Sequence, residues 1–452
     1  LQLGAPILAC PSARHSVRLL PIWLRGAIPV SIYSRIVPTV GKRDKIEMSE
    51  TPKSIVVIGA GIAGVASALF LQRDGHTVTI LDPRGVGEGA SFGNAGTIAP
   101  TSCVPTARPD TMKRVPKMLL DPAGSINIRW SYLPKLAPWL IDLIRNSSPE
   151  KILANAKAKT ALLEHAMAAY NELIADAQSE DMIVRNGILQ VFETDQGLKG
   201  MERDHALIKE CGHKIEFLPG EEIRQMEPAF SQKFKQAVYI ENHATIKHPG
   251  DLTKKFAAHF EAKGGAFLQE QVTGLTKAGA AWSVITDKGN HSADRVIVAA
   301  GAWSREIAQM LGRRMLLDTE RGSHVMLPQP NPTLRRPVLL GDQSVFLVPM
   351  THGLRVTSGV EFGGLQLPPD YRRIRNMVPF AKRVMPQVEE REMSIWMGFR
   401  PSTPDTRPIL GEMPGAEGIF FATGGSHIGM TLGPIMGKVT ADLVAGRDPG
   451  ID

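Results

Sequence analysis

Cysteine is scarce in this chain of 452 residues. Only Cys10, Cys103 and Cys211 occur, and no two of them stand in a CxxC spacing. This argues against both a disulfide framework and a cysteine-based zinc site. No metal is therefore expected, and a reducing compartment is the simpler inference, so we expect a cytoplasmic protein.

Long hydrophobic runs are also missing. The apolar stretch from Leu19 to Tyr33 is broken by Arg25 and two prolines, and it falls short of the roughly 20 residues that span a bilayer. We therefore expect no transmembrane segment. Residues 107–146 mix prolines, basic residues and bulky apolar side chains. They are predicted to form a flap packed on the body, with peripheral membrane contact as the alternative; the prolines favour the flap because they break long helices.

A strong charge of one sign is absent from most of the chain. The formal net charge is +7, but residues 1–47 alone hold seven Lys and Arg against two Asp and Glu. The rest is nearly neutral, which argues against a nucleic-acid-binding body. Residues 1–52 are expected to form a disordered extension with a candidate start at Met48. Translated upstream sequence and a transit peptide are the two readings left open.

The most informative stretch runs from Ser54 to Asp82. An apolar strand, a GxGxxG turn, a helix and a second strand follow in the order of a dinucleotide-binding unit. The glycines permit the turn and close approach to a pyrophosphate, and Asp82 lies near the offset at which a carboxylate meets a ribose. The predicted cofactor contacts are Gly59, Ala60, Gly61, Ile62, Ala63, Gly64 and Asp82.

A loop rich in small residues follows at 83–96. Its segment Gly89–Gly93 matches the GxSxG pattern of a hydrolase with Ser91 as nucleophile. That elbow needs a strand running directly into the serine, whereas here the strand ends at Asp82 and a proline follows. We therefore interpret the loop as a cofactor contact, and the expected residues are Ser91, Asn94, Ala95 and Gly96.

The remaining pattern alternates strands with helices, which predicts an α/β fold: a Rossmann-type domain with an inserted mixed-sheet substrate domain. Helices are expected at 151–177 and 252–263, and strands at 187–194, 213–218, 236–242, 266–273, 281–286 and 295–299. The last strand runs into Ala300 and Gly301, and a second glycine-rich turn lies at 424–431.

Taken together, the motifs resemble the FAD-dependent D-amino-acid oxidase and dehydrogenase superfamily, most closely the bacterial D-amino-acid dehydrogenase small-subunit-like proteins. The matching strings, spread over residues 53–447, are GAGIAG with Asp82, ASFGNAG, VIVAAGAWS, ERG, MGFRPSTPDTRPILG and FATGGSHIGMT. The resemblance implies an FAD domain made of residues 53–106, 250–318 and 400–447. It implies a substrate domain made of 107–249 and 319–399.

The resemblance also favours FAD over a nicotinamide, because a second glycine-rich segment returns near the flavin. Arg84 is accordingly interpreted as a solvated loop arginine rather than a 2′-phosphate ligand. Further cofactor contacts implied by the resemblance are Val272, Ala300, Gly301, Gly424, Gly429, Met430 and Thr431.

Four residues are predicted to act on the substrate. Arg400, in GFRP, stands where the family anchors the substrate carboxylate, for which a planar guanidinium is suited. Arg321 is a second candidate, with a salt bridge to Glu320 or Asp318 as the alternative. His427 and His324 are candidates for proton transfer, with a packing role as the alternative.

The predicted reaction is oxidation of a D-amino acid or a secondary amino acid by hydride transfer from Cα to flavin, giving an imine and then an oxo acid. The partners are an amino-acid substrate and an electron acceptor, which is a quinone, a carrier or dioxygen. A glycine or sarcosine oxidase-like enzyme and a D-hydroxyproline dehydrogenase-like enzyme remain as alternatives. A nucleic-acid-modifying flavoprotein is the alternative of another class. Ser323 and Gly425 depart from the family pattern and leave the substrate open.

Overall fold

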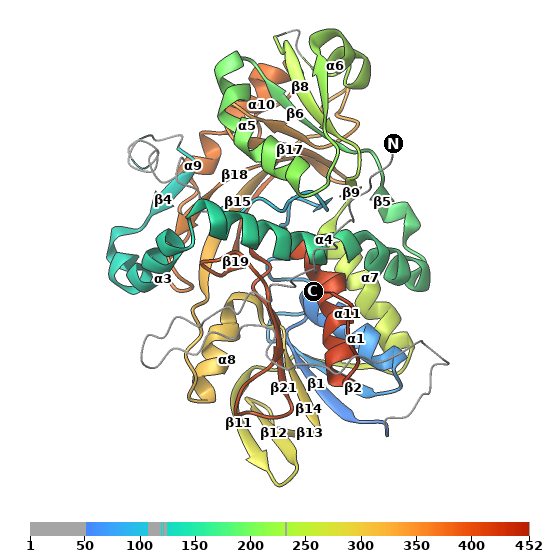
Figure 1. Cartoon of the computed structure of the whole chain (residues 1–452). Helices are drawn as coiled ribbons and strands as arrows, with labels where there is room; N and C mark the ends of the chain where they lie inside the picture. Colours follow the sequence, from blue (N-terminus) through green and yellow to red (C-terminus); the bar gives the residue numbers. More distant parts are fainter. Residues whose placement is uncertain (1–50, 107–118, 120, 122–123, 231–232, 452) are drawn as a thin grey trace, which may run out of the picture.

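The structure is a computed structural model, and it describes residues 51–106, 119, 121, 124–230 and 233–451. The predicted extension therefore lies almost entirely outside the described residues, as does part of the predicted flap. A six-stranded sheet forms the lower part of the molecule in Figure 1, and a nine-stranded sheet forms the upper part. The long helix α4 (Pro149–Ala177) crosses between them. This confirms the predicted α/β fold class.

The six-stranded sheet contains the dinucleotide-binding unit. Strand β1 pairs in parallel with β2 on one side and with β14 on the other, and only the edge pair of β20 and β21 is antiparallel. In spatial order the strands are β10 (Ala266–Leu268), β2 (Thr77–Leu81), β1 (Ser54–Ile58), β14 (Arg295–Val298), β21 (Ile419–Thr423) and β20 (Ile409–Glu412). Segments from both ends of the described chain thus share one sheet.

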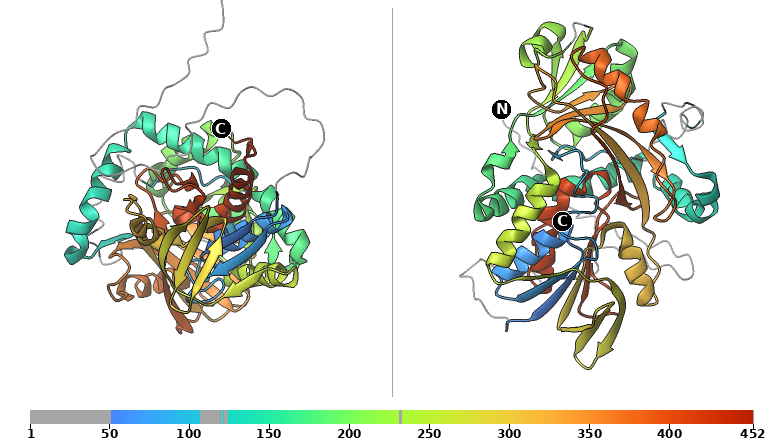
Figure 2. Two further views of the ribbon diagram at one scale, coloured as in Figure 1. Left: turned by 90° about the horizontal axis from the view of Figure 1, so that it is seen from below. Right: turned by 180° about the vertical axis from the view of Figure 1, so that it is seen from behind.

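The two faces of this sheet carry different partners because side chains alternate along a strand. In β1, Ile55 and Val57 join the core beneath the helices, whereas Val56 and Ile58 join the core on the opposite face. The helices on the first face are α1 (Ile62–Arg73), α7 (Pro249–Ala262) and α11 (Gly429–Val444). The other face carries β11 (Val272–Ala278), β12 (Ala281–Thr286), β13 (Asn290–Ala293) and α8 (Ser304–Met310) (Figure 2).

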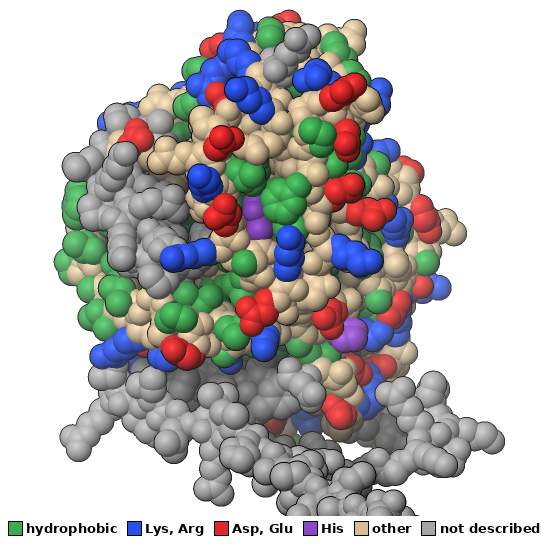
Figure 3. All heavy atoms as spheres, turned by 45° about the horizontal axis from the view of Figure 1, so that its top comes forward, with side chains coloured by type: hydrophobic (Ala, Val, Ile, Leu, Met, Phe, Trp, Pro, Cys, Tyr) green, Lys and Arg blue, Asp and Glu red, His purple; other side chains and the backbone are tan. Residues whose placement is uncertain are grey.

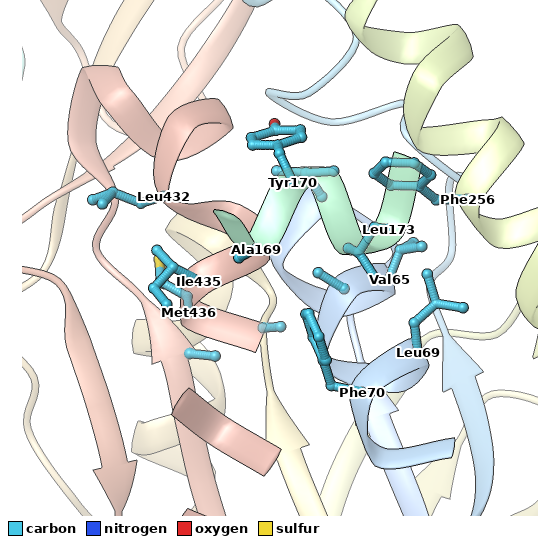
Figure 4. Close-up of a cluster of buried hydrophobic side chains, with 14 of the residues drawn as sticks. Val65, Leu69, Phe70, Ala169, Tyr170, Leu173, Phe256, Leu432, Ile435 and Met436 are labelled. Atoms are coloured by element: carbon cyan, nitrogen blue, oxygen red, sulfur yellow. The ribbon is translucent and has the colours of Figure 1, made fainter. Parts of the chain in front are cut away.

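Helices α1, α4, α7 and α11 meet in one apolar core (Figure 4). In this cluster α1 contributes Val65, Leu69 and Phe70, and α11 contributes Ile435 and Met436. The two helices approach closely: a Cβ on Gly437 would lie 2.6 Å from the backbone of Ala66. The hydroxyl of Tyr170 in α4 donates to the carbonyl of Met430 at 2.5 Å, which ties α4 to the start of α11.

The nine-stranded sheet lies above the six-stranded sheet in Figure 1. One of its faces is covered by α6 (Gly220–Met226), α9 (Arg372–Arg375) and α10 (Val378–Val384). Its strands are β19 (Ser394–Ser402), β15 (Asp318–Leu327), β18 (Gly353–Phe362), β17 (Val345–Met350), β16 (Val338–Leu340), β6 (Ile188–Phe192), β8 (Gln236–Ile240) and β7 (Glu216–Pro219), with β4 (Ile126–Ile128) beside β18. A small sheet joins β3 (Thr97–Ile98), β9 (Ala244–Ile246) and β5 (Ile183–Val184), and α5 (Asp195–Glu210) follows β6.

One local prediction is wrong. The single strand expected at 266–273 is two strands, because the chain turns at Glu270, whose N–H donates to Leu268, and β11 then joins a different sheet. Helix α3 (Leu133–Arg145) continues through Pro138. It is held there by Trp139, which packs on Phe362 and donates its Nε1–H to the carbonyl of Ser402 at 2.9 Å.

Helix α3 therefore packs on the body through Trp139, as a flap is expected to do, while Trp130, Ile141 and Ile144 stay exposed. Among the described residues, no helix is long and apolar enough to cross a bilayer. On the face shown in Figure 3, acidic and basic side chains are interspersed, in line with the nearly neutral charge of the body.

Candidate active site

A cavity of about 530 Å³ lies between the two large sheets. It is lined by the glycine turn after β1, by the loop at 89–104, by the turn after β14, by β19 and by residues 422–431. These segments lie far apart in the sequence and meet at the carboxyl ends of β1 and β14. This is where α/β sheets bind their ligands, and the volume is typical of a ligand site.

The first glycine turn has the geometry of a phosphate cradle. Gly59 has a φ of +112°, and a Cβ there would lie 2.4 Å from the carbonyl oxygen of Ala299. A Cβ on Gly64 would lie 1.9 Å from the carbonyl oxygen of Gly59, so that glycine lets α1 approach β1. Gly61, Ile62 and Ala63 line the cavity at the positive N-terminus of α1.

Asp82 and Ser91 organise this end of the cavity. The buried carboxylate of Asp82 accepts from the N–H of Ala60 at 3.0 Å and from the N–H of Arg84 at 2.8 Å. The hydroxyl of Ser91 accepts from the N–H of Ile62 at 3.0 Å, where it caps α1. Arg84 lines the cavity and its guanidinium lies 4.0 Å above the ring of Trp303, so it is more than a solvated loop residue.

The second glycine-rich turn, residues 424–431, forms the other end of the cavity. It passes through the short helix η4 (Ser426–Ile428) into α11. The side-chain oxygen of Ser426 is buried at the cavity wall, and no described residue forms a hydrogen bond with it. Nothing lies within 4 Å of a Cβ built on Gly429, so this glycine faces open space. Thr431 is already occupied: it accepts from Ala99 and donates to Thr97.

These features fit a flavin dinucleotide. The open Gly61–Ala63 turn suits the diphosphate, and the unpartnered Ser426 hydroxyl and the open space at Gly429 leave room and hydrogen-bonding capacity for a polar ring system. Gly425 packs against Gly429, and a Cβ on Gly425 would lie 2.7 Å from the Cα of Gly429. This close contact leaves no room for a side chain at position 425.

Arg400 reaches the cavity from β19. Its Nη1 donates to the carbonyl of Gly359 at 3.1 Å, and it forms no ion pair with a carboxylate of the described residues. Burial lowers the pKa of its guanidinium, and the charge of Glu320 opposes that shift. The group is nevertheless a cation at every working pH, so the cavity wall carries a positive charge without a directly bonded counter-ion.

Glu320 is the cross-strand partner of Arg400. It is 5% exposed, and burial raises the pKa of its carboxyl, while the charges of Arg400 and Lys159 oppose that shift. Lys159 enters from α4 and donates to the carbonyl of Val104 at 3.3 Å. Burial lowers the pKa of Lys159 to about 8. These groups form a buried polar layer behind Arg400.

Arg321 does not line the cavity, although it was predicted as a substrate ligand. Its side chain points to the opposite face of β15 and pairs with Glu361 at 2.9 Å. Its guanidinium also donates to the carbonyls of Gly363, Gly364 and Leu367 at 2.6–2.8 Å. The ion-pair partner is therefore Glu361, and not Glu320 or Asp318 as the alternative proposed. These contacts give Arg321 a structural role: it ties β15 to the end of β18 and to the loop that follows it.

The two predicted histidines differ in position. His427 lines the cavity, whereas His324 does not: it is covered by two residues that do. Its ring stacks on Trp396 at 5.3 Å, and its Nδ1 lies 3.1 Å from the carbonyl oxygen of Gly93. Burial lowers the pKa of each histidine to about 3, helped at His427 by Lys159 and at His324 by Arg355. Both are neutral at physiological pH.

All the predicted site residues can be sorted by whether they line this cavity. Those that line the cavity are Gly61, Ile62, Ala63, Asp82, Ser91, Asn94, Ala95, Ala300, Gly301, Arg400, His427, Gly429, Met430 and Thr431. Those that lie outside its lining are Gly59, Ala60, Gly64, Gly96, Val272, Arg321, His324 and Gly424. Val272 instead belongs to the core beneath β11.

Several lining residues were not singled out from the sequence. They are Gly93, Trp303, Phe346, Trp396 and Phe399. Trp396 lies directly over two glycines, since a Cβ on Gly93 or on Gly398 would come within 2.0 Å of its ring. The glycine two positions after Trp396 in WMGFR was the one available signal, and it is weak without the strand pairing.

Comparison with known proteins places the chain in a family. The family model for FAD-dependent oxidoreductases, DAO, matches residues 54–443. A D-amino-acid oxidase of Bradyrhizobium diazoefficiens is 33% identical over 410 residues, which cover 88% of this chain and 96% of the relative.

Solved structures share the fold. The glycine oxidase of Geobacillus kaustophilus has a TM-score of 0.67 at 23% identity, covering 89% of this chain and 96% of its own. The L-proline dehydrogenase of P. horikoshii has a TM-score of 0.67 at 19% identity, covering 88% and 94%. With the family match over most of the chain, the resemblance inferred from the motifs is confirmed: this protein belongs to the DAO family of FAD-dependent oxidoreductases, and its cofactor is FAD.

Proposed function

We propose that this enzyme oxidises an amino acid at the bond between Cα and nitrogen, with a D-amino acid or a secondary amino acid as substrate. The observation that carries the proposal is Arg400, a cation without a bonded carboxylate, on the wall of the cavity that the two glycine-rich turns enclose. A guanidinium binds a carboxylate through two parallel hydrogen bonds. The relatives support the substrate class, since the curated one is named a D-amino-acid oxidase.

The residues have separate roles in this proposal. Arg400 holds the substrate carboxylate and thereby orients Cα toward the second glycine-rich turn. His427, neutral at physiological pH, offers the substrate amine a hydrogen-bonding nitrogen without adding a positive charge. The buried layer of Glu320 and Lys159 keeps Arg400 in place. Asp82, with the Gly61–Ala63 turn, holds the adenosine diphosphate part of FAD.

Bound FAD supplies the acceptor for the hydride that leaves Cα. That hydride carries two electrons away from the substrate, and loss of one further proton from the nitrogen leaves an imine. Water then hydrolyses the imine to an oxo acid and ammonia, or an amine where the substrate is secondary. A quinone, an electron carrier or dioxygen takes up the two electrons and completes the cycle.

The test is reduction of the purified, FAD-loaded protein without oxygen. D- and L-amino acids, D-hydroxyproline, sarcosine, glycine and proline are added one at a time, and the visible flavin absorption is followed. We expect at least one D-amino acid or secondary amino acid to bleach it. If no amino acid bleaches the flavin, the proposal is wrong. Bleaching by both glycine and sarcosine, with none by any D-amino acid or by proline or D-hydroxyproline, would favour the glycine or sarcosine oxidase-like alternative.

A further inference from the structure

One row of cross-strand neighbours extends across the nine-stranded sheet from the candidate site. Paired residues on adjacent strands point to the same face of a sheet. The row begins on β19 and ends on β6, and its members in spatial order are Trp396, His324, Thr357, Phe346, Leu339 and Gln190. All of them except His324 line the cavity.

The alternation along each strand confirms which face this is. Val356, Leu347 and Leu340 are the sequence neighbours of row members, and each is fully buried in the core beneath α9 and α10. Side chains one position away point to the opposite side. Thr357, Phe346 and Leu339 therefore face the cavity.

The wall formed by the far part of this row is apolar. Phe346 packs against Ile188 and Ile240 in a small cluster, and Leu339 and Met201 add to the same side of the cavity. The polar members of the row, Gln190 and Thr357, form hydrogen bonds with other protein groups. Gln190 is hydrogen-bonded to His205 at 2.8 Å, and the Thr357 hydroxyl donates to the carbonyl of Ser323 at 2.9 Å.

This wall stands at a side chain's reach from Arg400. Arg400 donates to Gly359, which lies two positions along β18 from Thr357, and Thr357 pairs with Phe346 on β17. Two residues along a strand and one strand across correspond to about 8 Å. This is comparable with the reach of a leucine, methionine or phenylalanine side chain when its carboxylate is bound.

We propose that the preferred substrate is an amino acid with a bulky apolar side chain, which lies against Phe346, Leu339 and Ile188. The inference rests on the proposed amino-acid oxidation and narrows its substrate class. Glycine and sarcosine have no side chain to fill this space. A charged side chain would lose its hydration against these three residues, and an acidic one would also approach Asp204, which lines the cavity one helical turn from Met201.

The experiment compares anaerobic flavin reduction of the FAD-loaded enzyme by glycine, sarcosine and both enantiomers of alanine, leucine, methionine, phenylalanine, glutamate and lysine. We expect the second-order rate constant for leucine, methionine or phenylalanine to exceed that for alanine or glycine at least tenfold. If glycine, sarcosine or a charged amino acid is the best reductant, the apolar wall does not select the substrate, although amino-acid oxidation stands. If none reduces the flavin, the proposed function itself is wrong.

Two variants test the wall directly. Leu339→Phe narrows the space and should lower the ratio of the leucine rate constant to the alanine rate constant at least fivefold. Phe346→Ala widens the space and should raise the rate constant for phenylalanine relative to that for leucine. The ratio is measured within one preparation, so partial unfolding cancels. Phe217→Ala, at a half-exposed position outside the cavity, is the control and should leave the ratio unchanged. Unchanged ratios in both wall variants would overturn the inference.

Discussion

The guanidinium of Arg400 occupies the space that a side chain at position 322 would fill. A Cβ on Gly322 would lie 2.2 Å from Nη2 of Arg400 and 2.4 Å from its Cζ. The two residues come from adjacent antiparallel strands, β15 and β19. The glycine of the ERG motif is therefore explained by the arginine of the GFRP motif, about 80 residues later in the chain.

Gly322→Ala should displace Arg400 while leaving its charge in the chain. We expect substrate binding to weaken at least tenfold, about 1.4 kcal/mol, with only a small change in Tm. The measurement is the substrate dependence of anaerobic flavin reduction. Gly200→Ala is a matched control, since nothing lies within 4 Å of a Cβ there and the helix gains propensity. Equal affinity in wild type and Gly322→Ala would show that Arg400 tolerates the change.

Arg400→Leu should remove the carboxylate anchor. The expected loss of substrate affinity is about 2–5 kcal/mol, or roughly thirtyfold to several thousandfold. Arg400→Lys keeps the positive charge but not the planar guanidinium, so its affinity for the substrate should lie between those of the wild type and Arg400→Leu. Retention of FAD and of Tm serves as the check on folding. An unchanged apparent affinity in Arg400→Leu would remove this residue from the site.

Arg321→Met should affect stability instead. It leaves the carboxylate of Glu361 and the carbonyls of Gly363, Gly364 and Leu367 without their donor. Removing one partner of a buried ion pair costs about 3–5 kcal/mol. The free energy of unfolding, measured in denaturant, should fall by this order. A stable Arg321→Met variant with impaired substrate binding would restore Arg321 as a substrate ligand.

His324 should make stability depend on pH. Its pKa is about 3 in the folded protein, below the ordinary value of 6.5, so between these limits the unfolded chain binds a proton that the folded chain does not. Stability is therefore lost as the pH falls below 6.5. In His324→Gln, the slope of unfolding free energy against pH between 6 and 5 should fall by about 1 kcal/mol per pH unit. The same slope in variant and wild type would mean that His324 is protonated in the folded state.

Cys103 should resist alkylation in the folded protein. Burial, aided by the neighbouring Cys211, raises the pKa of its thiol to about 12, so almost none is thiolate at pH 8. Peptide mass spectrometry after iodoacetamide treatment should find Cys103 unmodified in the native protein and labelled after denaturation. Equal labelling in both states would contradict the burial of this thiol.

The dinucleotide unit could be predicted because its signals are local. The turn at Gly59, the helix after it and Asp82 depend on residues within one stretch of about 30 positions, and the structure has β1, α1 and β2 there. The second turn at 424–431 carries the same kind of signal. Its partnership with the first is not local and was inferred only from family resemblance.

The roles of the two arginines could not be separated in this way. In the strand pairing, Arg400 stands opposite Glu320, and Arg321 stands opposite Phe399. A shift of one residue along a strand reverses the face to which a side chain points. No sequence signal fixes that register here, so Arg321 remained a second candidate beside Arg400. The structure places only Arg400 on the cavity. Trp396 and Gly93 were missed for the same reason, since their contact joins a loop to a distant strand.

The six-stranded sheet is built from strands near both ends of the described chain, and this affects how the protein folds during its synthesis. Strands β1 and β2 leave the ribosome first, but β21, which completes the central part of their sheet, begins about 360 residues after β1 ends. At roughly 5–20 residues per second, that is a delay of about 20–70 seconds. The edge of β1 is open for the first part of this time, because β14, its neighbour on that side, begins about 240 residues after β1 ends. Strand β14 in turn lacks its neighbour β21 until the end of this time. The FAD cradle is therefore among the first parts of the described chain to be made and among the last to be assembled, and the strand edges that are open until then are exposed to edge-to-edge aggregation.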